Sequence, residues 1–312
     1  MIHGENMDKT IKLDKAFHLA ILKKHNSPVI THADLYDILL SLYKNKYFDG
    51  VKIGKIRKDE PEFDIFKAKV RALENSGIIS SLEDSRAYSI SGKGTISAEQ
   101  AGCYLYPFSN LCYLSAMEYH GLTERIPKVV QLMIPKTHIY QNLLKENYSK
   151  EWMIENIYSN KRNIKIRNKK ISRKTFRYFE TSKFTLYKEV PDSGGIRVSP
   201  IGRTFLDMFQ KPSECGGFSH VLDVLEEYGE RYQRLILKEF DKNGSNIDKS
   251  RLGFYLESVM GVKNKILDKW SEKVQRGSSR VFMPGGDFSP YYSERWCISI
   301  NMEYLQQYGT RN

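Results

Sequence analysis

Apolar residues recur every three to four positions in three stretches near the start of the chain, and this spacing predicts three helices. The first covers about Leu13–Lys24, and the third covers about Pro61–Ser76. The second begins after Thr31, which is suited to cap a helix, with Asp34 three residues later in the second position of a capping box.

Two short runs typical of β-strands, Ile78–Leu82 and Ala87–Ile90, follow the third helix. Three helices and a hairpin in this order form the layout of a winged helix-turn-helix, whose third helix enters the DNA major groove while the hairpin contacts the backbone. The layout gives four candidate DNA-binding residues: Lys67, Lys69, Arg71 and Arg86. Residues 1–100 carry 16 basic and 14 acidic side chains, so a small protein-interaction module remains an alternative.

The rest of the chain is expected to form a second, larger domain of mixed α/β structure. The predicted fold class is therefore α+β, with a winged helix-turn-helix domain at 1–95 and a C-terminal domain at 96–312. We expect residues 91–106, which contain Gly92 and Gly94, to link the two domains. Further elements are expected at these positions: a helix over 109–120, strands over 129–134 and within 163–190, and helices over 203–210 and from 218 to about 240.

Charge is concentrated in one segment of this 312-residue chain, whose formal net charge is +12. Residues 161–177 hold nine Lys or Arg and no acidic residue, which leaves only +3 for the remainder. Such a run attracts phosphates or acidic surfaces, although a solvated loop is an equally simple interpretation. Aromatic residues interleave with the charges, as in proteins that bind nucleic acids through phosphate contacts and stacking. The segment adds six candidate DNA-binding residues: Lys165, Arg167, Lys169, Lys170, Arg173 and Lys174.

The common catalytic signatures are missing from the sequence. It contains no GxxxxGK[ST] or GxGxxG loop, no GxSxG or HExxH motif, and no Asp or Glu followed two positions later by Lys. The seven histidines have no metal-ligand spacing, and the four cysteines are scattered without a CxxC pair. We therefore expect no catalytic residue, no metal site and no cofactor, and we expect buried thiols rather than disulfides.

No run of eighteen apolar residues occurs, and the N-terminal residues lack an apolar signal core. These features predict a cytoplasmic protein that has no membrane partner.

Three blocks of the sequence, taken in order, resemble one protein family. The first spans 109–135 and contains Ser115-Ala116, His120-Gly121-Leu122 and Pro127. The second contains Arg203-Thr204-Phe205-Leu206-Asp207, followed by Pro212 and Cys215-Gly216-Gly217, and the third is RLGFYLE at 251–257. Their order and spacing are similar to those of AbiEi-type antitoxins, the regulatory components of type IV toxin–antitoxin and abortive-infection systems.

The resemblance implies a protein with two roles and no catalytic activity. The N-terminal domain would bind inverted repeats in double-stranded DNA at its own promoter and repress its own operon. The C-terminal domain would neutralise a cognate nucleotidyltransferase-like toxin. The matching motif residues are expected to be structural: Arg203, Asp207, Gly216, Gly217 and Arg251. Arg203 and Asp207 lie four residues apart, so they can pair on one face of a helix.

Two other interpretations remain open from the sequence. One is a metal-dependent nuclease or other nucleic-acid enzyme, for which Asp207, Asp223, Glu226 and Glu227 are the nearest candidates. The other is a pure protein-interaction module whose basic strands dock an acidic partner.

Overall fold

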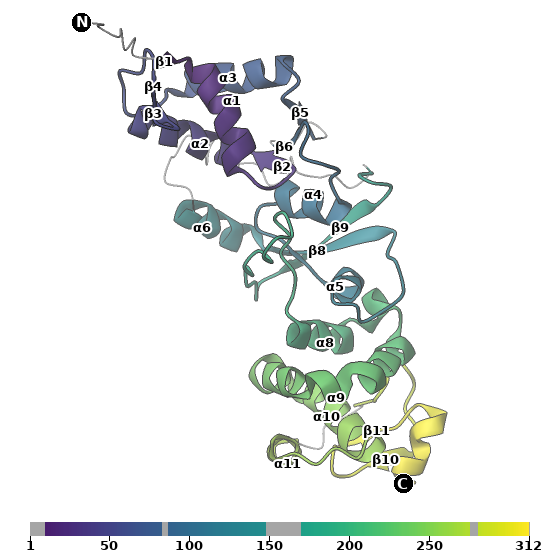
Figure 1. The fold of residues 1–312 in the computed structure, drawn as a ribbon. Coiled ribbons are helices and arrows are strands. Elements are labelled where there is room, and N and C mark those ends of the chain that lie inside the picture. The colour runs from purple at the N-terminus through teal and green to yellow at the C-terminus, as the bar shows by residue number, and fades with distance from the viewer. Residues whose placement is uncertain (1–9, 83–86, 148–169, 275–279, 312) are drawn as a thin grey trace, which may run out of the picture. The chain divides into compact units, whose positions relative to one another are not determined.

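The computed structural model describes residues 10–82, 87–147, 170–274 and 280–311 (Figure 1). The chain divides into two compact units: residues 1–110 with 128–197 form unit 1, and residues 111–127 with 198–312 form unit 2. Both units contain helices and short strands, so the protein has an α+β fold. The sequence-based boundary at residue 95 falls inside unit 1, and an autonomous winged helix-turn-helix domain at 1–95 stays a prediction.

Within the described ranges, unit 1 contains five α-helices and eight short strands. In chain order these elements are β1 (Thr10–Ile11), α1 (Leu13–Lys24), β2 (Val29–Thr31), α2 (His32–Asn45), β3 (Tyr47–Phe48), β4 (Val51–Ile53), α3 (Phe63–Asn75), β5 (Ile79–Ser81), β6 (Ala87–Ile90), α4 (Ala98–Leu105), β8 (Val129–Pro135), α6 (Thr137–Asn147) and β9 (Thr175–Thr181). Strand β7 (Asn110–Leu111) lies at the boundary between the two units.

The first three predicted helices are present, and their buried faces explain why they form. Helix α1 has the predicted bounds, and α3 is two residues shorter at its start and one shorter at its end than predicted. At the start of α2 the Thr31 hydroxyl accepts a hydrogen bond from the backbone N–H of Asp34, and the Asp34 carboxylate accepts one from the backbone N–H of Thr31. This confirms the predicted capping box, which satisfies two N–H groups that the helix itself leaves unpaired.

A small antiparallel sheet lies beside these helices, with strand order β2-β6-β5. The predicted hairpin is formed by β5 and β6, with Ile79 opposite Ile90 and Ser81 opposite Tyr88. Strand β2 was not predicted. It pairs with β6 on the side opposite β5, because the chain after α1 becomes extended at Ser27-Pro28.

The segment 91–106 is not a linker, and this prediction was wrong. Residues 98–105 form α4, whose start is fixed by a reciprocal capping box between Ser97 and Gln100. Gly102 faces β8 and β9, where an added Cβ would lie 3.0 Å from side-chain atoms of Leu132 and Phe176. The glycine therefore lets the helix pack closely against the two strands. The capping-box sequence S-x-x-Q at 97–100 is the sequence signal that could have predicted this helix.

Strands β8 and β9 pair in parallel over their full lengths, from Val129 opposite Thr175 to Pro135 opposite Thr181. The prediction for 129–134 is confirmed. Of the strands expected within 163–190, the described part contains β9, while residues 163–169 lie outside the described ranges and 182–190 form no strand.

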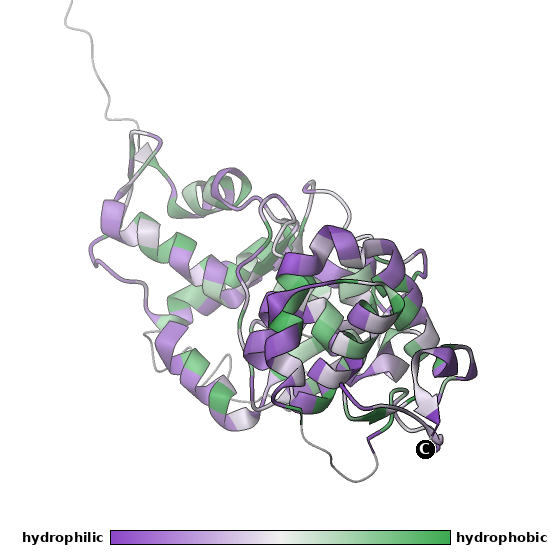
Figure 2. Ribbon diagram, turned by 90° about the horizontal axis from the view of Figure 1, so that it is seen from below, coloured by the Kyte–Doolittle hydropathy of each residue, from purple (hydrophilic) through white to green (hydrophobic). Residues whose placement is uncertain are grey.

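Unit 2 is built mainly from helices whose hydrophobic sides face one another (Figure 2). Its elements in chain order are α5 (Tyr113–Tyr119), α8 (Ile201–Gln210), η3 (Pro212–Cys215), α9 (Phe218–Asn243), α10 (Asn246–Phe254), a π-helical turn η4 (Tyr255–Val259), α11 (Lys265–Ser271), β10 (Tyr291–Ser293), β11 (Ile298–Ser299), η5 (Glu303–Tyr308) and β12 (Thr310–Arg311).

The core of unit 2 is aromatic, and it lies between α8, α9, α10 and the segment around Phe282. Phe209 contacts Phe218 and Phe240 edge to face, with ring centroids 5.9 and 5.5 Å apart. Phe282 lies 5.1 Å from Phe254 and stacks on Tyr255 at 5.9 Å. Burial of such large side chains is the main source of stability here.

Candidate nucleic-acid interface

Helix α3 is attached to α2 through its apolar face, which leaves the opposite face exposed. Phe66 is fully buried and makes edge-to-face contacts with Tyr36 at 5.5 Å and with His32 at 5.9 Å. Tyr88 of β6 lies within hydrogen-bond distance of His32, 3.0 Å from its Nε2, so the hairpin is anchored to α2 as well. These contacts fix the direction in which α3 presents its polar side chains.

The exposed side of α3, here called the α3 outer face, contains mostly small or neutral residues around one arginine. Its members follow helical spacing: Ile65, Ala68, Arg71, Ala72 and Asn75. The side chain of Arg71 is exposed and forms no hydrogen bond or ion pair with any other described residue. The alanines leave room for a close approach of another surface, and Arg and Asn are the side chains that bind guanine and adenine edges through paired hydrogen bonds.

The two other predicted contacts on α3 have partners within the protein. Lys67 pairs with Asp64 at 2.8 Å and lies over the ring of Phe63 at 4.6 Å from its centroid. Lys69 pairs with Asp14 of α1 at 2.6 Å, because its side chain leaves α3 on the side that faces α1. Exposed ion pairs contribute little stability, about 0–1 kcal/mol, so Lys67 can exchange Asp64 for a phosphate at small cost.

Arg86, predicted to contact DNA from the hairpin, lies outside the described residues, as do Lys165, Arg167 and Lys169 of the basic segment. The other three residues predicted in that segment are described. Lys170 is exposed, and Arg173 is exposed at the tip of a tight turn. The two-residue turn joins Ile171 to Lys174, which exchange backbone hydrogen bonds of 3.0 and 2.9 Å.

The turn that carries Arg173 has an unusual backbone, since Ser172 and Arg173 have φ angles of 49° and 66°. Positive φ at two successive residues other than glycine is unfavourable, so other contacts must hold the turn. One of them is a hydrogen bond of 2.9 Å from the Ser172 hydroxyl to the carbonyl of Ile96. The guanidinium of Arg173 is thus presented to solvent on a tethered turn.

Lys174 differs from its neighbours because it forms a half-buried ion pair. Its ammonium group lies 2.8 Å from the Glu99 carboxylate, and the two side chains are 19% and 18% exposed. Burial alone would raise the pKa of Glu99, but the hydrogen bond from Lys174 and a backbone hydrogen bond outweigh it, and the pKa is lowered. The contact joins α4 to the start of β9, which gives Lys174 a structural role.

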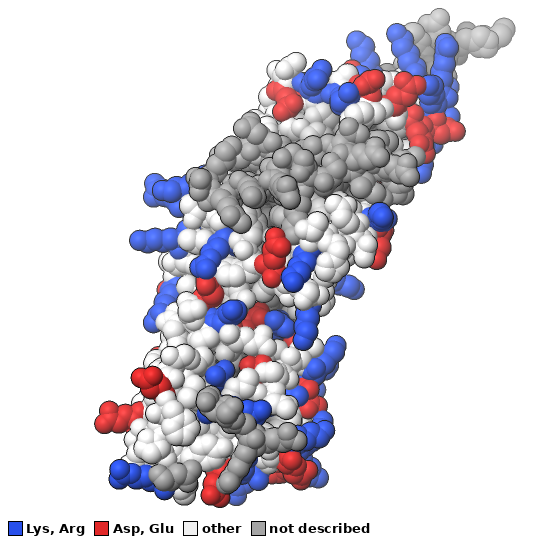
Figure 3. Space-filling model, turned by 180° about the vertical axis from the view of Figure 1, so that it is seen from behind, with Lys and Arg blue, Asp and Glu red and all other residues white. Residues whose placement is uncertain are grey.

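Lys and Arg side chains are mixed with Asp and Glu over the described parts of the surface that Figure 3 shows. In unit 1 several of the exposed basic residues already face acidic ones, as Lys58 faces Glu62 and Lys46 faces Asp59. Among the predicted DNA-binding residues that are described, the side chains of Arg71, Lys170 and Arg173 have no acidic partner in the described ranges, and Lys67 has only its exposed pair with Asp64. These four remain candidates for contact with DNA.

The motif residues of unit 2 have structural contacts. Arg203 and Asp207 pair within α8, as predicted, with Nε of Arg203 donating to Oδ1 of Asp207 at 2.9 Å. Gly216 has a φ of 91°, and an added Cβ would lie 2.5 Å from Nη1 of Arg125, which donates to the Gly216 carbonyl. This agrees with the expected close approach at Gly216, whereas a Cβ at Gly217 would meet nothing within 4 Å.

Arg251 binds the chain that leads into the C-terminal strands. Its Nε and Nη2 both donate to the carbonyl of Val281, at 3.2 and 3.1 Å. Burial lowers the pKa of Arg251, although the nearby Asp248 carboxylate opposes this effect. The arginine therefore has a structural contact, in agreement with its motif position.

The candidates for a nuclease site are also described. Asp207 is buried against Arg203, and Glu226 accepts a hydrogen bond from the hydroxyl of Tyr255. In the described ranges, no three His, Cys, Asp or Glu side chains gather in a way that could hold a metal ion. All four cysteines are buried and unpaired, as expected. Every helix within the described ranges is too short or too polar to span a lipid bilayer.

Comparisons with known proteins give no family for this chain. No family model matches the sequence, and no curated protein matches it. Among solved structures, the crystal structure of the RV2827C protein from Mycobacterium tuberculosis is similar, with a TM-score of 0.48 and 9% sequence identity over 96% of each chain. A likeness this low assigns neither a fold nor a function.

Proposed function

We propose that this protein is a DNA-binding regulator that represses its own operon through a winged helix at its N-terminus. The observation that carries the proposal is the arrangement of α1, α2 and α3 beside the β2-β6-β5 sheet, with the α3 outer face exposed. Helix–strand–helix–helix–hairpin is the order of elements in a winged helix, in which the third helix reads the major groove.

In this proposal one set of residues in unit 1 contacts the bases of the DNA and another set contacts its phosphates. Arg71 and Asn75 contact base edges from α3, while Ala68 allows the helix to approach the groove. Lys67, Lys170 and Arg173 contact phosphates, which supply affinity without sequence preference. Lys69 and Lys174 hold the fold through Asp14 and Glu99, so they are not among the DNA contacts that we propose.

The second role, neutralisation of a nucleotidyltransferase-like toxin, rests on the resemblance to AbiEi-type antitoxins. The structural contacts of Arg203, Gly216 and Arg251 support it, because they agree with the scaffold role that the resemblance implies for them. The protein has no catalytic activity in this proposal. The nuclease alternative is less favoured because Asp207 already has Arg203 as its partner in a buried site.

A titration of the full-length protein on its own upstream DNA tests the regulator role, with random DNA of equal length alongside. We expect a preference of roughly a thousandfold for the upstream DNA, the scale of specific regulators. If about six phosphates are contacted, the affinity falls on the order of a thousandfold between 50 and 200 mM salt. Equal binding to both DNAs would contradict the proposal and favour a protein-interaction module.

Matched variants separate the two roles. Arg71→Gln removes a proposed base contact, and Lys183→Gln removes one exposed positive charge of unit 1 that lies on no proposed interface. We expect Arg71→Gln to lose repression of an operon reporter while it still rescues cells that express the toxin encoded next to it. Loss of rescue together with repression, in a variant that remains folded, would contradict this separation of roles.

A further inference from the structure

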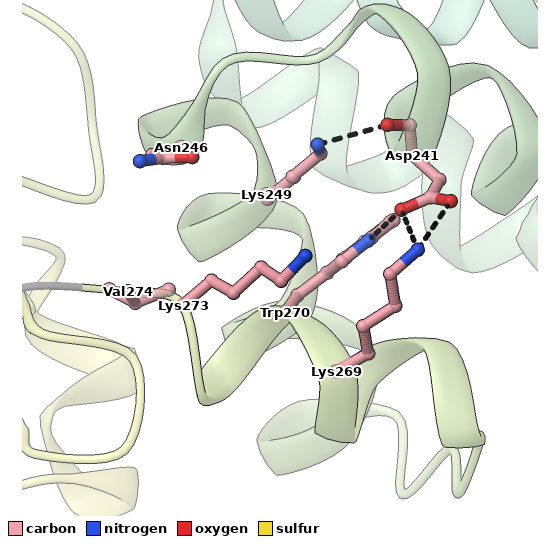
Figure 4. A pocket seen from close by; sticks show the side chains of 7 residues that line it. All are labelled: Asp241, Asn246, Lys249, Lys269, Trp270, Lys273 and Val274. Carbon is pink, nitrogen blue, oxygen red and sulfur yellow. Dashed lines mark hydrogen bonds and ion pairs between the residues drawn. The ribbon is translucent and has the colours of Figure 1, made fainter.

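A pocket in unit 2 gathers three lysines around a single carboxylate, and it does not depend on the proposed DNA-binding role. The pocket has a volume of about 160 Å³ and lies between the end of α9, the start of α10 and the end of α11 (Figure 4). The residues that line it are Asp241, Asn246, Lys249, Lys269, Trp270, Lys273 and Val274. Three ammonium groups and one carboxylate give the lining a charge of +2.

The carboxylate of Asp241 accepts hydrogen bonds from two of its neighbours, Trp270 and Lys269. Trp270 donates its indole N–H to Oδ1 of Asp241 at 2.8 Å, and Lys269 lies 3.1 and 3.0 Å from the two carboxylate oxygens. The hydrogen bond from Trp270, together with that from Lys269, lowers the pKa of Asp241. Asp241 is therefore fixed in its ionised form against Lys269 and Trp270.

The two remaining ammonium groups lack an acidic partner among the described residues. Lys249 donates one hydrogen bond of 3.0 Å to the backbone carbonyl of Asp241, and its ammonium lies 6.0 Å from the centre of the Trp270 ring. The side chain of Lys273 forms no hydrogen bond or ion pair with a described residue, and it extends along the pocket in Figure 4. An ammonium group has three N–H donors, so both lysines have donors left for a ligand.

The start of α10 adds to the positive potential. This helix of nine residues begins at Asn246, which lines the pocket, and the first N–H groups of a helix have no acceptor within it. The nearby Asp248 carboxylate acts in the opposite direction, but it accepts hydrogen bonds from Ser245 and Gln210 and does not line the pocket.

We infer that this pocket binds a phosphomonoester, that is, a terminal phosphate group that carries nearly two negative charges. Such a group has a charge of about −1.5 to −2 at neutral pH, which matches the +2 of the lining, whereas a phosphodiester carries only one charge. Its three terminal oxygens accept hydrogen bonds from Lys249, Lys273 and the backbone at the start of α10. Trp270 and the engaged Asp241 form the wall and hold Lys269 in place.

Calorimetric titration of the full-length protein with inorganic phosphate tests the inference, with chloride at equal ionic strength as the reference. We expect saturable binding of phosphate and none of chloride, with a change in the fluorescence of Trp270. Lys249→Gln and Lys273→Gln should each weaken binding by about tenfold or more, the usual effect of losing a hydrogen bond to a charged group. Lys263→Gln, an exposed lysine that does not line the pocket, is the matched control and should bind as the unchanged protein does.

Two further ligands distinguish the sources of such a phosphate. A single-stranded oligonucleotide with a 5′-phosphate is compared with the same strand bearing a 5′-hydroxyl, and adenosine monophosphate serves as a small ligand. An advantage of the phosphorylated strand that Lys273→Gln abolishes assigns the pocket to nucleic-acid ends, and binding of the small ligands alone assigns it to free phosphates. Equal effects of phosphate and chloride, or equal weakening by Lys263→Gln, would overturn the inference.

Discussion

Arg203 and Asp207 form an ion pair inside α8 in which the carboxylate is 2% exposed and the guanidinium lies 2.7 Å from Oδ1. The other carboxylate oxygen, Oδ2, is buried and has no hydrogen-bond partner among the described residues. Burial raises the pKa of Asp207 to about 6, although the charge and hydrogen bond of Arg203 act to lower it. Arg203 is therefore the main group that permits a charged carboxylate at this position.

The first prediction is that Arg203→Met destabilises the protein much more at pH 8 than at pH 5. Loss of one partner of a buried pair typically costs about 3–5 kcal/mol, because the other charge stays uncompensated. At pH 5 Asp207 is protonated in the folded protein, so the loss of Arg203 leaves no uncompensated charge and costs less free energy of unfolding. The free energy of unfolding, obtained from denaturant titrations at both pH values, measures the effect.

The sign of the pH effect follows from the raised pKa of Asp207. An acid whose pKa is higher in the folded state favours folding at low pH, and this contribution is lost as the pH rises from about 4, the pKa of an unperturbed Asp, through the folded value. Removing Arg203 raises the folded pKa further and extends the loss to higher pH. The double variant Arg203→Met/Asp207→Asn is the control and should lose most of this pH dependence; a pH-independent cost of Arg203→Met alone would contradict the account.

The second prediction concerns two helical glycines in unit 2. An alanine Cβ at Gly253 in α10 would lie 2.2 Å from ring atoms of Trp296, which is fully buried, whereas at Gly229 in α9 the nearest atom would be the end of the Leu225 side chain at 3.0 Å. Alanine favours a helix over glycine by about 1 kcal/mol in both cases. We expect Gly253→Ala to lower stability by about 1–3 kcal/mol through overpacking, and Gly229→Ala to change it little.

Thermal unfolding of the two glycine variants checks this contrast in one experiment. The helix-propensity term is the same for both, so it cancels in the comparison. An equal change in the melting temperature for the two variants would show that the close approach of Gly253 to Trp296 is not what requires glycine there.

The third prediction separates two neighbouring basic residues, Arg173 and Lys174. Lys174→Gln breaks the half-buried pair with Glu99 and should lower stability by about 1–2 kcal/mol, while the affinity for DNA changes little. Arg173→Gln should leave stability unchanged and reduce by about one the slope of log affinity against log salt concentration. Unfolding titrations and DNA titrations of both variants test these two expectations. If Lys174→Gln lowers DNA affinity while the protein stays folded, Lys174 contacts DNA and the structural role proposed here is wrong.

Local sequence signals predicted much of unit 1 because they act over a few residues. The capping pair Thr31 and Asp34 and the buried stripe of α3 specify helices without reference to the rest of the chain. The same kind of signal, Ser97 with Gln100, is present at the start of α4. It was not used in the prediction because Gly92 and Gly94 favoured a linker there. Strand β2 could not be predicted, since three residues form a strand only when a partner such as β6 is present.

The candidate site was less predictable, because the sequence shows charge but not the partner of each charge. Lys67, Lys69 and Arg71 look alike in the sequence, yet two of them face Asp64 and Asp14. Lys249 and Lys273 lie 24 positions apart, and only the fold of unit 2 brings them to one pocket. Asn75 was within reach of sequence reasoning, since it shares the helical spacing of Arg71.

The fourth prediction is that two residues of α3 change DNA binding in different ways. Arg71 lies on the α3 outer face without a partner among the described residues, so Arg71→Gln should cost about 1–3 kcal/mol on the upstream DNA and relax the preference for one base pair. Lys67→Gln should weaken binding to all sequences alike, because a phosphate contact carries no sequence information. Titration of both variants on the upstream DNA and on single-base substitutions of it measures the difference.

Asn75→Ala should relax the preference at a different position from Arg71→Gln, since the two side chains lie about one turn apart on the helix. A uniform loss of affinity in all three variants would mean that α3 contacts only the DNA backbone.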